Sequence, residues 1–377
     1  MAGIGVDRMG DAADAAGDPG ILRLENLDTD IRPLAAALDA TRAAVDDDAA
    51  NSYLPFPGHE RLRRAAAAHV SRLAGVEVDW SSQCVISAGG LSGILNVLLA
   101  FVEPGDEVVL TDPIYVGLLN RVRVAGATPR LAPLVASAEG WRLDRDALAA
   151  AVGPATRMLL LMSPSMPTGC VLDADDWAFV ADLCERHDLL LLHDTAMERI
   201  LFDGRRLLSP LADPRLRPRT VVVGSASKEL RMIGWRVGWI VAPPELVPDI
   251  GLVAISNVVC QTGIAQDAVA VALEAGDEDV AAATAELERR RDLILGELAG
   301  FPVVPPGGGW SLLLDVAALG HDAAAASELL FEKGRIAATP MVGWGEQAAR
   351  YVRFVFANEP VERLRGIGER VRSALVA

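Results

Sequence analysis

Short apolar segments alternate with longer amphipathic segments along most of the chain. The apolar segments have the length of strands and end at turn-forming residues; they are 84–88, 107–111, 157–162, 189–193, 220–224 and 236–241. Between them lie segments with the periodicity of a helix, notably 91–102, 116–124, 174–186 and 278–298. Strands that alternate with helices form parallel sheets covered by helices. The sequence therefore predicts a mostly parallel α/β sheet.

The pattern changes after Phe301, where short strands at 310–316 and 351–356 alternate with helices near 323–332 and 360–375. Prolines and the glycines 307–309 mark this junction. We expect a second, smaller α+β domain after it. The expected parts are a flexible N-terminal tail at 1–20, an N-terminal segment that packs with the small domain at 21–50, a large domain at 51–289 and a small domain at 290–377.

Charge and hydropathy exclude several classes of protein. The 377 residues contain 35 Lys and Arg against 51 Asp and Glu, a net charge of −16 that disfavours nucleic acids and acidic membranes as partners. A mean hydropathy of +0.28 argues against disorder. The most apolar stretch, 91–102, is shorter than the roughly 20 residues that span a bilayer. The N-terminus lacks the pattern of a signal peptide and the four cysteines are scattered, so we expect a cytoplasmic protein with no metal site.

Lysine is almost absent from the chain. Of the 35 basic residues, only Lys228 and Lys333 are lysines. An amine can lose its proton and attack a carbonyl, whereas a guanidinium stays charged, so Schiff-base chemistry requires lysine. Lys333 precedes a glycine at the expected end of a helix, which favours a structural role. Lys228 follows an apolar strand, where the loops of α/β sheets present chemical groups, and is therefore the candidate nucleophile.

Seven motifs occur in an order that resembles the class I and II aminotransferases. They are 53–58 (YLPFPG), 88–90 (AGG), 112–115 (DPIY), 164–169 (PSMPTG), Asp194, 225–228 (SASK) with 234–236 (GWR), and 351–353 (YVR). The resemblance covers residue 22 to the C-terminus. It implies the fold type I architecture of pyridoxal 5′-phosphate (PLP) enzymes, with a large, mostly parallel seven-stranded α/β/α domain and a smaller α+β C-terminal domain. It also implies transfer of an amino group between an L-amino acid and a 2-oxo acid.

Three residues match the family's catalytic positions. Lys228 would form the Schiff base with PLP and later move the substrate proton. Asp194 follows an apolar strand and would keep the pyridine nitrogen protonated, which makes the ring an electron sink. Tyr115 resembles the aromatic residue stacked on the cofactor ring. Each has a plainer interpretation, namely a surface lysine, a helix cap and a core tyrosine.

A second group resembles the phosphate-binding residues of the family. The backbone N–H groups of Gly89, Gly90 and Leu91 would open a helix, and helix N-termini attract anions. Ser225 and Arg236 match the hydroxyl and guanidinium ligands, and a guanidinium binds phosphate through two hydrogen bonds. The alternatives are an ordinary strand-to-helix turn and a salt-bridged arginine.

Two further matches imply a substrate clamp and a partner subunit. Arg353 places a charge in an apolar strand, which is costly unless it meets an anion, and it resembles the clamp for the substrate α-carboxylate. Tyr53 resembles the residue that reaches the cofactor phosphate of the neighbouring subunit. The resemblance thus implies a homodimer with shared active sites.

Two cofactor positions depart from the family. The family has Asn before the second proline of the 164–169 motif and Tyr three residues after the pyridine-binding Asp, whereas this chain has Met166 and Met197. The family residues donate hydrogen bonds to the cofactor phenolate, which a thioether cannot do. Ser165, Thr195 or an ordered water is a candidate substitute, and packing against the ring is the plainer role for both methionines.

The sequence leaves open both the class of reaction and the identity of the amino donor. A PLP-dependent lyase, cyclase or oxidase would use the same chemistry at Lys228, and the two methionines are its only support. A ligand-sensing regulator of the same fold would need a DNA-binding module, for which we expect no room before residue 22.

No arginine lies in 255–263, where dicarboxylate-specific relatives often bind a distal carboxylate, although Arg121, Arg199 and Arg231 are alternatives. Acidic Asp28 and Asp30 would suit a cationic side chain.

The two methionines lead to a spectroscopic prediction. With fewer donors to the phenolate, the internal hydrogen bond of the Schiff base strengthens, so we expect its pKa to be higher than in relatives that carry Asn and Tyr. Titration of the yellow absorption band with pH measures the pKa of the Schiff base. The Met166→Asn, Met197→Tyr double variant should have a lower pKa. A low pKa that the double variant leaves unchanged would contradict the hypothesis.

Overall fold

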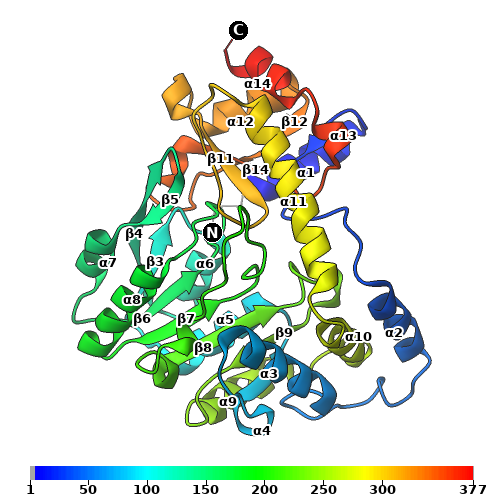
Figure 1. Cartoon of the computed structure of the whole chain (residues 1–377), viewed down its shortest axis with the longest axis vertical. Coiled ribbons are helices and arrows are strands. Elements are labelled where there is room, and N and C mark those ends of the chain that lie inside the picture. The colour runs from blue at the N-terminus through cyan, green and yellow to red at the C-terminus, as the bar shows by residue number, and fades with distance from the viewer. Residues whose placement is uncertain (1–4, 377) are drawn as a thin grey trace.

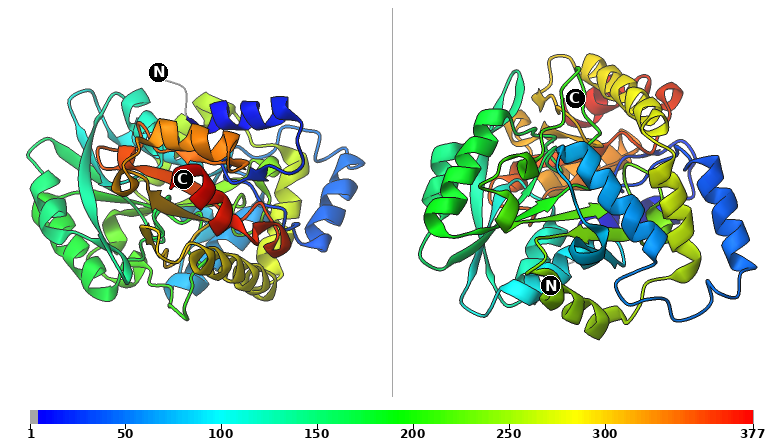
Figure 2. Two further views of the ribbon diagram at one scale, coloured as in Figure 1. Left: turned by 90° about the horizontal axis from the view of Figure 1, so that it is seen from above. Right: turned by 60° about the horizontal axis from the view of Figure 1, so that its bottom comes forward.

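The computed structural model describes residues 5–376. A large sheet covered by helices forms one part, and a smaller sheet with its own helices lies against it (Figure 1). Seen from two further directions, the long helix α11 lies along one side of the molecule and α2 stands at its edge (Figure 2). The predicted α/β fold with a smaller α+β part is confirmed.

The large sheet has the strand order β2-β9-β8-β7-β6-β3-β4-β5. Its strands β3, β4, β6, β7 and β8 are parallel, while β9 runs antiparallel to β8 and β2. The bounds are β2 Cys84–Ser87, β3 Glu107–Asp112, β4 Thr128–Ser137, β5 Gly140–Leu143, β6 Thr156–Met162, β7 Leu190–Asp194, β8 Thr220–Ser225 and β9 Gly238–Val241. Because the parallel strands end at one edge, the residues that follow them are brought together there.

Successive side chains of these strands point to opposite faces, and each face has its own core. On β7, Leu191 packs into the cluster that contains α8, whereas Leu192 packs with α5 and α6. Helices α3 and α10 cover the end of the sheet near β2 and β9. The helices of the large part are α3 Glu60–Ala74, α4 Trp80–Gln83, α5 Gly90–Phe101, α6 Val116–Val124, α7 Arg145–Ala151, α8 Ala174–His187, α9 Val247–Val258 and α10 Gly263–Glu274.

The sheet contains one strand more than the seven expected. Strand β4 continues past its parallel pairing with β3 and turns back into β5, which pairs with it antiparallel. Strand β4 was not predicted, since Pro129 and Pro133 interrupt it and proline usually argues against a strand. The helix expected near 360–375 is also broken, into α13 (Val361–Leu364) and α14 (Ile367–Leu375).

The small part is built on an antiparallel sheet of order β10-β11-β14-β13. Its elements are β10 Val303–Val304, β11 Ser311–Asp315, α12 Ala323–Glu332, β12 Ile336–Ala337, β13 Thr339–Pro340 and β14 Tyr351–Val355, followed by α13 and α14. Strand β1 (Leu22–Arg23) pairs in parallel with β12, so the N-terminal segment returns to this part of the molecule.

The N-terminal residues differ from the expected flexible tail. Residues 1–4 of that tail lie outside the described residues, but Gly5–Ala16 form helix α1, which buries Met9 and Ala13. These apolar side chains lie four residues apart and therefore on one helix face. Helix α2 (Ala35–Val45) instead packs against α10 of the large part.

Helix α11 (Glu278–Glu297) runs from the large part to the small part (Figure 1). Its Arg290 binds Asp30 and the carbonyl oxygen of Ala357, each at 2.7–2.8 Å for the nearest atoms. We therefore propose that the domain boundary falls within this helix, near residue 290.

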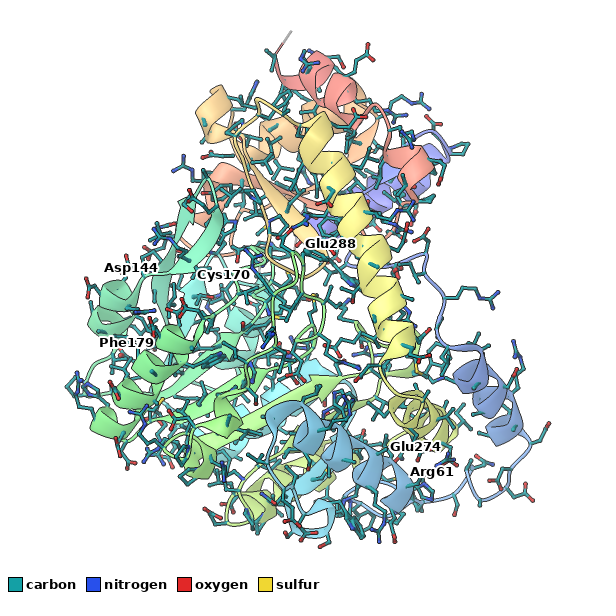
Figure 3. All side chains as sticks on the ribbon, in the orientation of Figure 1. Arg61, Asp144, Cys170, Phe179, Glu274 and Glu288 are labelled. Atoms are coloured by element: carbon teal, nitrogen blue, oxygen red, sulfur yellow. The ribbon has the colours of Figure 1, made fainter. Side chains whose placement is uncertain are left out.

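Figure 3 shows Glu288 on α11 and, lower in the molecule, Arg61 beside Glu274. The side chains of Arg61 and Glu274 join α3 to α10 through hydrogen bonds of 3.0 and 2.6 Å. Within residues 5–376, no helix is long and apolar enough to cross a membrane.

The contact between α11 and α14 gives a stability prediction. A Cβ on Gly368 would overlap the carbonyl oxygen of Glu297, whereas a Cβ on Gly296 would meet nothing within 4 Å. We expect Gly368→Ala to lower the free energy of unfolding by about 2 kcal/mol or more, because the helices must separate. Gly296→Ala is the matched control and should raise the free energy of unfolding by up to about 1 kcal/mol, because alanine has the higher helix propensity. Equal effects of the two substitutions in urea unfolding would disprove the close contact.

Candidate active site

A cavity of about 150 Å³ lies at the carboxyl edge of the large sheet. The segments that follow the parallel strands line it, so residues far apart in the sequence meet there. The lining includes Tyr115 after β3, Met166 after β6, Asp194 at the end of β7 and Lys228 after β8. Its position fits the rule that ligands of open α/β sheets bind at the carboxyl ends of the strands.

Lys228 is held as a weakly basic amine. Its Nζ donates a hydrogen bond to the carbonyl oxygen of Leu27 at 2.6 Å and lies 4.8 Å from the ring centre of Trp310. Burial lowers the pKa of Lys228 from 10.5 to about 7, an effect that Asp28 opposes and that the charge of Arg353 reinforces. A large fraction of this amine is therefore uncharged at neutral pH, as a nucleophile or a proton acceptor requires.

Asp194 ends β7 with a buried carboxylate. Burial raises its pKa to about 6, while the N–H of Ala196, which donates to Oδ1 at 3.0 Å, and the charge of Arg121 lower it. No side-chain cation lies within 4 Å of this carboxylate among residues 5–376. A cationic ring nitrogen placed there would supply the missing partner and favour the ionised carboxylate.

The N-terminus of α5 forms a cradle for an anion. Gly89 has φ 89° and precedes the helix, so the first N–H groups of α5 lack intrahelical acceptors. An added Cβ would lie 2.5 Å from Arg236 Nη2 at Gly89 and 3.1 Å from the Cβ of Ser225 at Gly90. A guanidinium and a hydroxyl-bearing residue thus border a helix N-terminus, and glycine leaves the backbone accessible. Leu91 also lines the cavity.

Arg353 is a fully buried guanidinium without a carboxylate partner among the described residues. Its Nη2 donates to the carbonyl oxygen of Glu25 at 2.5 Å and to Thr339 Oγ1 at 3.3 Å, and its Nη1 lies 3.7 Å from Met166 Sδ. Its Nε has no acceptor. Burial lowers the pKa of Arg353 to about 10. Such a group is stabilised by an incoming anion.

The two methionines and Tyr115 complete the wall of the cavity. Met166 and Met197 are buried, and neither sulfur can donate a hydrogen bond to a ligand. The hydroxyl of Thr195 donates to the carbonyl oxygen of Val223 at 3.2 Å, so its proton is already used. The hydroxyl of Ser165 has no partner, but Ser165 does not line the cavity.

Tyr53 lies outside this group. Its side chain is 83% exposed and is not part of the cavity lining. The structure of one chain therefore brings eleven of the twelve predicted positions to the cavity or its rim and leaves Tyr53 at the surface.

Several contacts around Lys228 and Arg236 were not predicted from the sequence. Leu27 and Trp310 contact the lysine amine, and Ser227 Oγ accepts a hydrogen bond from Arg236 at 3.2 Å. Ser227 lies next to Lys228 in the 225–228 motif, which was a usable signal. Leu27 acts through its backbone oxygen, for which no residue type is diagnostic.

The arrangement fits PLP on observations of this structure. It offers an amine of lowered pKa for the aldehyde, an unpaired buried carboxylate for the ring nitrogen, and a glycine cradle beside a guanidinium for the phosphate. The amine, the carboxylate and the glycine cradle all border the same cavity. Arg353 contacts Met166, which lines this cavity.

Comparison with known proteins gives a consistent result. The family described as aminotransferase class I and II matches residues 23–371. A probable N-succinyldiaminopimelate aminotransferase, DapC, of Mycobacterium tuberculosis is 35% identical over 89% of this chain and 89% of its own. The arginine–pyruvate transaminase AruH of Pseudomonas aeruginosa is 33% identical over 85% of this chain and 82% of its own. The solved structure of N-succinyldiaminopimelate aminotransferase from Mycobacterium tuberculosis superimposes with a TM-score of 0.92 at 32% identity, covering 98% and 97% of the two chains.

The lowered pKa of Lys228 predicts a pH profile. Because the uncharged fraction of an amine with a pKa of about 7 rises about tenfold between pH 6 and pH 8, arylation by trinitrobenzenesulfonate should rise likewise at this residue. Peptide mapping of the apoprotein measures it, with exposed Lys333 as the reference on the same chain. A profile at Lys228 that rises only above pH 9 would show that burial does not lower this pKa.

Proposed function

The chain belongs to the class I and II aminotransferases, and we propose that it performs their reaction with the residues gathered at the carboxyl edge of the large sheet. It is a PLP-dependent enzyme that moves an amino group between an amino acid and a 2-oxo acid. When bound, PLP withdraws electrons from the amino acid joined to it. The observation that carries the residue assignment is the lowered pKa of Lys228 in a cavity that also contains Asp194.

Each charged group has a distinct role in this proposal. Lys228 Nζ is a base of suitable strength to take the proton from Cα of the bound amino acid and return it to the cofactor side. Asp194 holds a proton on the ring nitrogen. The N–H groups of Gly90 and Leu91, together with Ser225 and Arg236, hold the phosphate.

The substrate α-carboxylate binds Arg353 in this proposal. The guanidinium is buried, has a free Nε–H and lacks an acidic partner among the described residues. A carboxylate accepts two parallel hydrogen bonds from such a group. Leu27 and Trp310 lie over Lys228 and reduce the access of water to its amine.

We propose that the preferred donor has an apolar side chain. The three arginines that were candidates for a distal carboxylate are already engaged: Arg199 with Glu229 and Asp277, Arg231 with Asp279, and Arg121 with the carbonyl oxygens of Leu91 and Gly117. Asp30 is likewise paired with Arg290. The remaining lining of the cavity is largely apolar and includes Leu27, Leu118 and Ile233.

We also propose a homodimer with shared active sites. Tyr53 and Phe56 are exposed on the segment between α2 and α3, and Leu252 on α9 is 66% exposed, as expected of a surface that a partner subunit covers. Tyr53 would then reach the phosphate cradle of the partner. Sedimentation of the holoprotein as a monomer at micromolar concentration would contradict this.

The cytoplasm is the proposed compartment. All four cysteines are unpaired thiols, and Cys84, Cys170 and Cys184 are buried. Cysteines kept as thiols are typical of reducing compartments.

The half-reaction without a 2-oxo acid tests the function and the donor together. Single amino acids are added to the holoprotein, and loss of the yellow band is followed. We expect leucine or phenylalanine to react with a second-order rate constant at least about tenfold higher than that of aspartate, since burying a distal carboxylate without a partner is costly. Arginine as the fastest donor would show that Asp28 decides specificity instead. A persistent band with every donor, or a non-keto product, would favour a lyase, cyclase or oxidase.

A further inference from the structure

The loop 341–347 of the small domain is fastened to the large domain by one buried carboxylate. Asp112 ends β3, and its Oδ2 accepts the backbone N–H groups of Glu346 and Gln347, each at 2.9 Å. The N–H of Ile114 donates to the carbonyl oxygen of Trp344 at 3.0 Å. Three hydrogen bonds thus join the segment after β3 to this loop.

Gly345 lets the loop approach so closely. Its φ is 134°, a conformation that L side chains rarely adopt, and a Cβ there would overlap Asp112 Oδ1. The carboxylate therefore lies directly against the loop backbone, where only glycine fits.

Trp344, next to this glycine, links the loop to the active site. Its side chain is fully buried. Its ring centre lies 4.7 Å from the guanidinium carbon of Arg353 and 5.4 Å from the ring centre of Tyr115, at an interplanar angle of 64°. A guanidinium over an indole face is held by electrostatic attraction, which is stronger when buried.

From these contacts we propose that Asp112 and Trp344 are positioning residues that align Arg353 for the substrate α-carboxylate. The other partners of Arg353 are neutral acceptors at Glu25, Thr339 and Met166, so no acidic side chain fixes its orientation. The indole face fixes it instead, and Asp112 fixes the indole. This inference rests on the proposed role of Arg353.

The test compares KM for the amino donor with kcat in the complete reaction of the holoenzyme, with a 2-oxo acid present at saturation. Asp112→Ala should raise KM for the amino donor about tenfold and change kcat less than about threefold, because the clamp is misaligned while Lys228 and Asp194 stay in place. Asp112→Asn keeps an oxygen that accepts both N–H groups and should restore most of the affinity. Trp344→Leu, which leaves Asp112 intact, should give the same rise in KM. Asp315→Asn, which breaks an ion pair with Arg350 in the same domain, is the control and should change neither constant.

A double-mutant cycle separates positioning from general damage. In the Arg353→Ala background, Asp112→Ala should change KM less than about twofold, because the clamp that it aligns is gone. Equal effects in both backgrounds, or a normal KM in Asp112→Ala and Trp344→Leu, would overturn the proposal. If Arg353→Ala itself leaves KM unchanged, the assigned role of Arg353 fails instead.

Discussion

Loss of water around three charged groups is the constraint on which the active site depends. Burial lowers the pKa of Lys228 and Arg353 and raises that of Asp194, and none of the three is paired with an opposite charge within residues 5–376. Other buried arginines, such as Arg290 and Arg291, are bound by carboxylates. Unpaired buried charge is expensive, so its concentration in and beside one cavity marks the place where a ligand supplies the partners.

Much of the fold could be predicted because the apolar pattern is strong where elements are buried. Helices α6 and α12 begin and end where the periodicity indicates, and β7 and β8 differ from their predicted segments by one residue. The eighth strand, β5, could not be predicted, since it pairs only with the end of β4, whose prolines argue against a strand. Helix α1 was missed because its burial depends on distant segments of the chain.

The residues of the candidate site could be predicted where the chemistry requires a particular type of side chain. Lys228 and Asp194 stand out because few chemistries need a lysine or an acid directly after a strand. The geometry that tunes them could not be predicted: the carbonyl oxygen of Leu27 carries no side-chain signal, and the indole of Trp344 meets Arg353 only because the loop 341–347 folds back against β14. Such contacts depend on tertiary structure, which periodicity does not encode.

The pairing of β1 with β12 has a mechanical consequence. This pairing and the bond from Arg290 to Asp30 join the N-terminal segment to the small domain at two points. If the small domain rotates, these two contacts carry residues 22–30 with it, so Leu27 and Arg353 move together relative to Lys228. The access to Lys228 and the position of the carboxylate-binding arginine are thereby coupled, since one movement would change both.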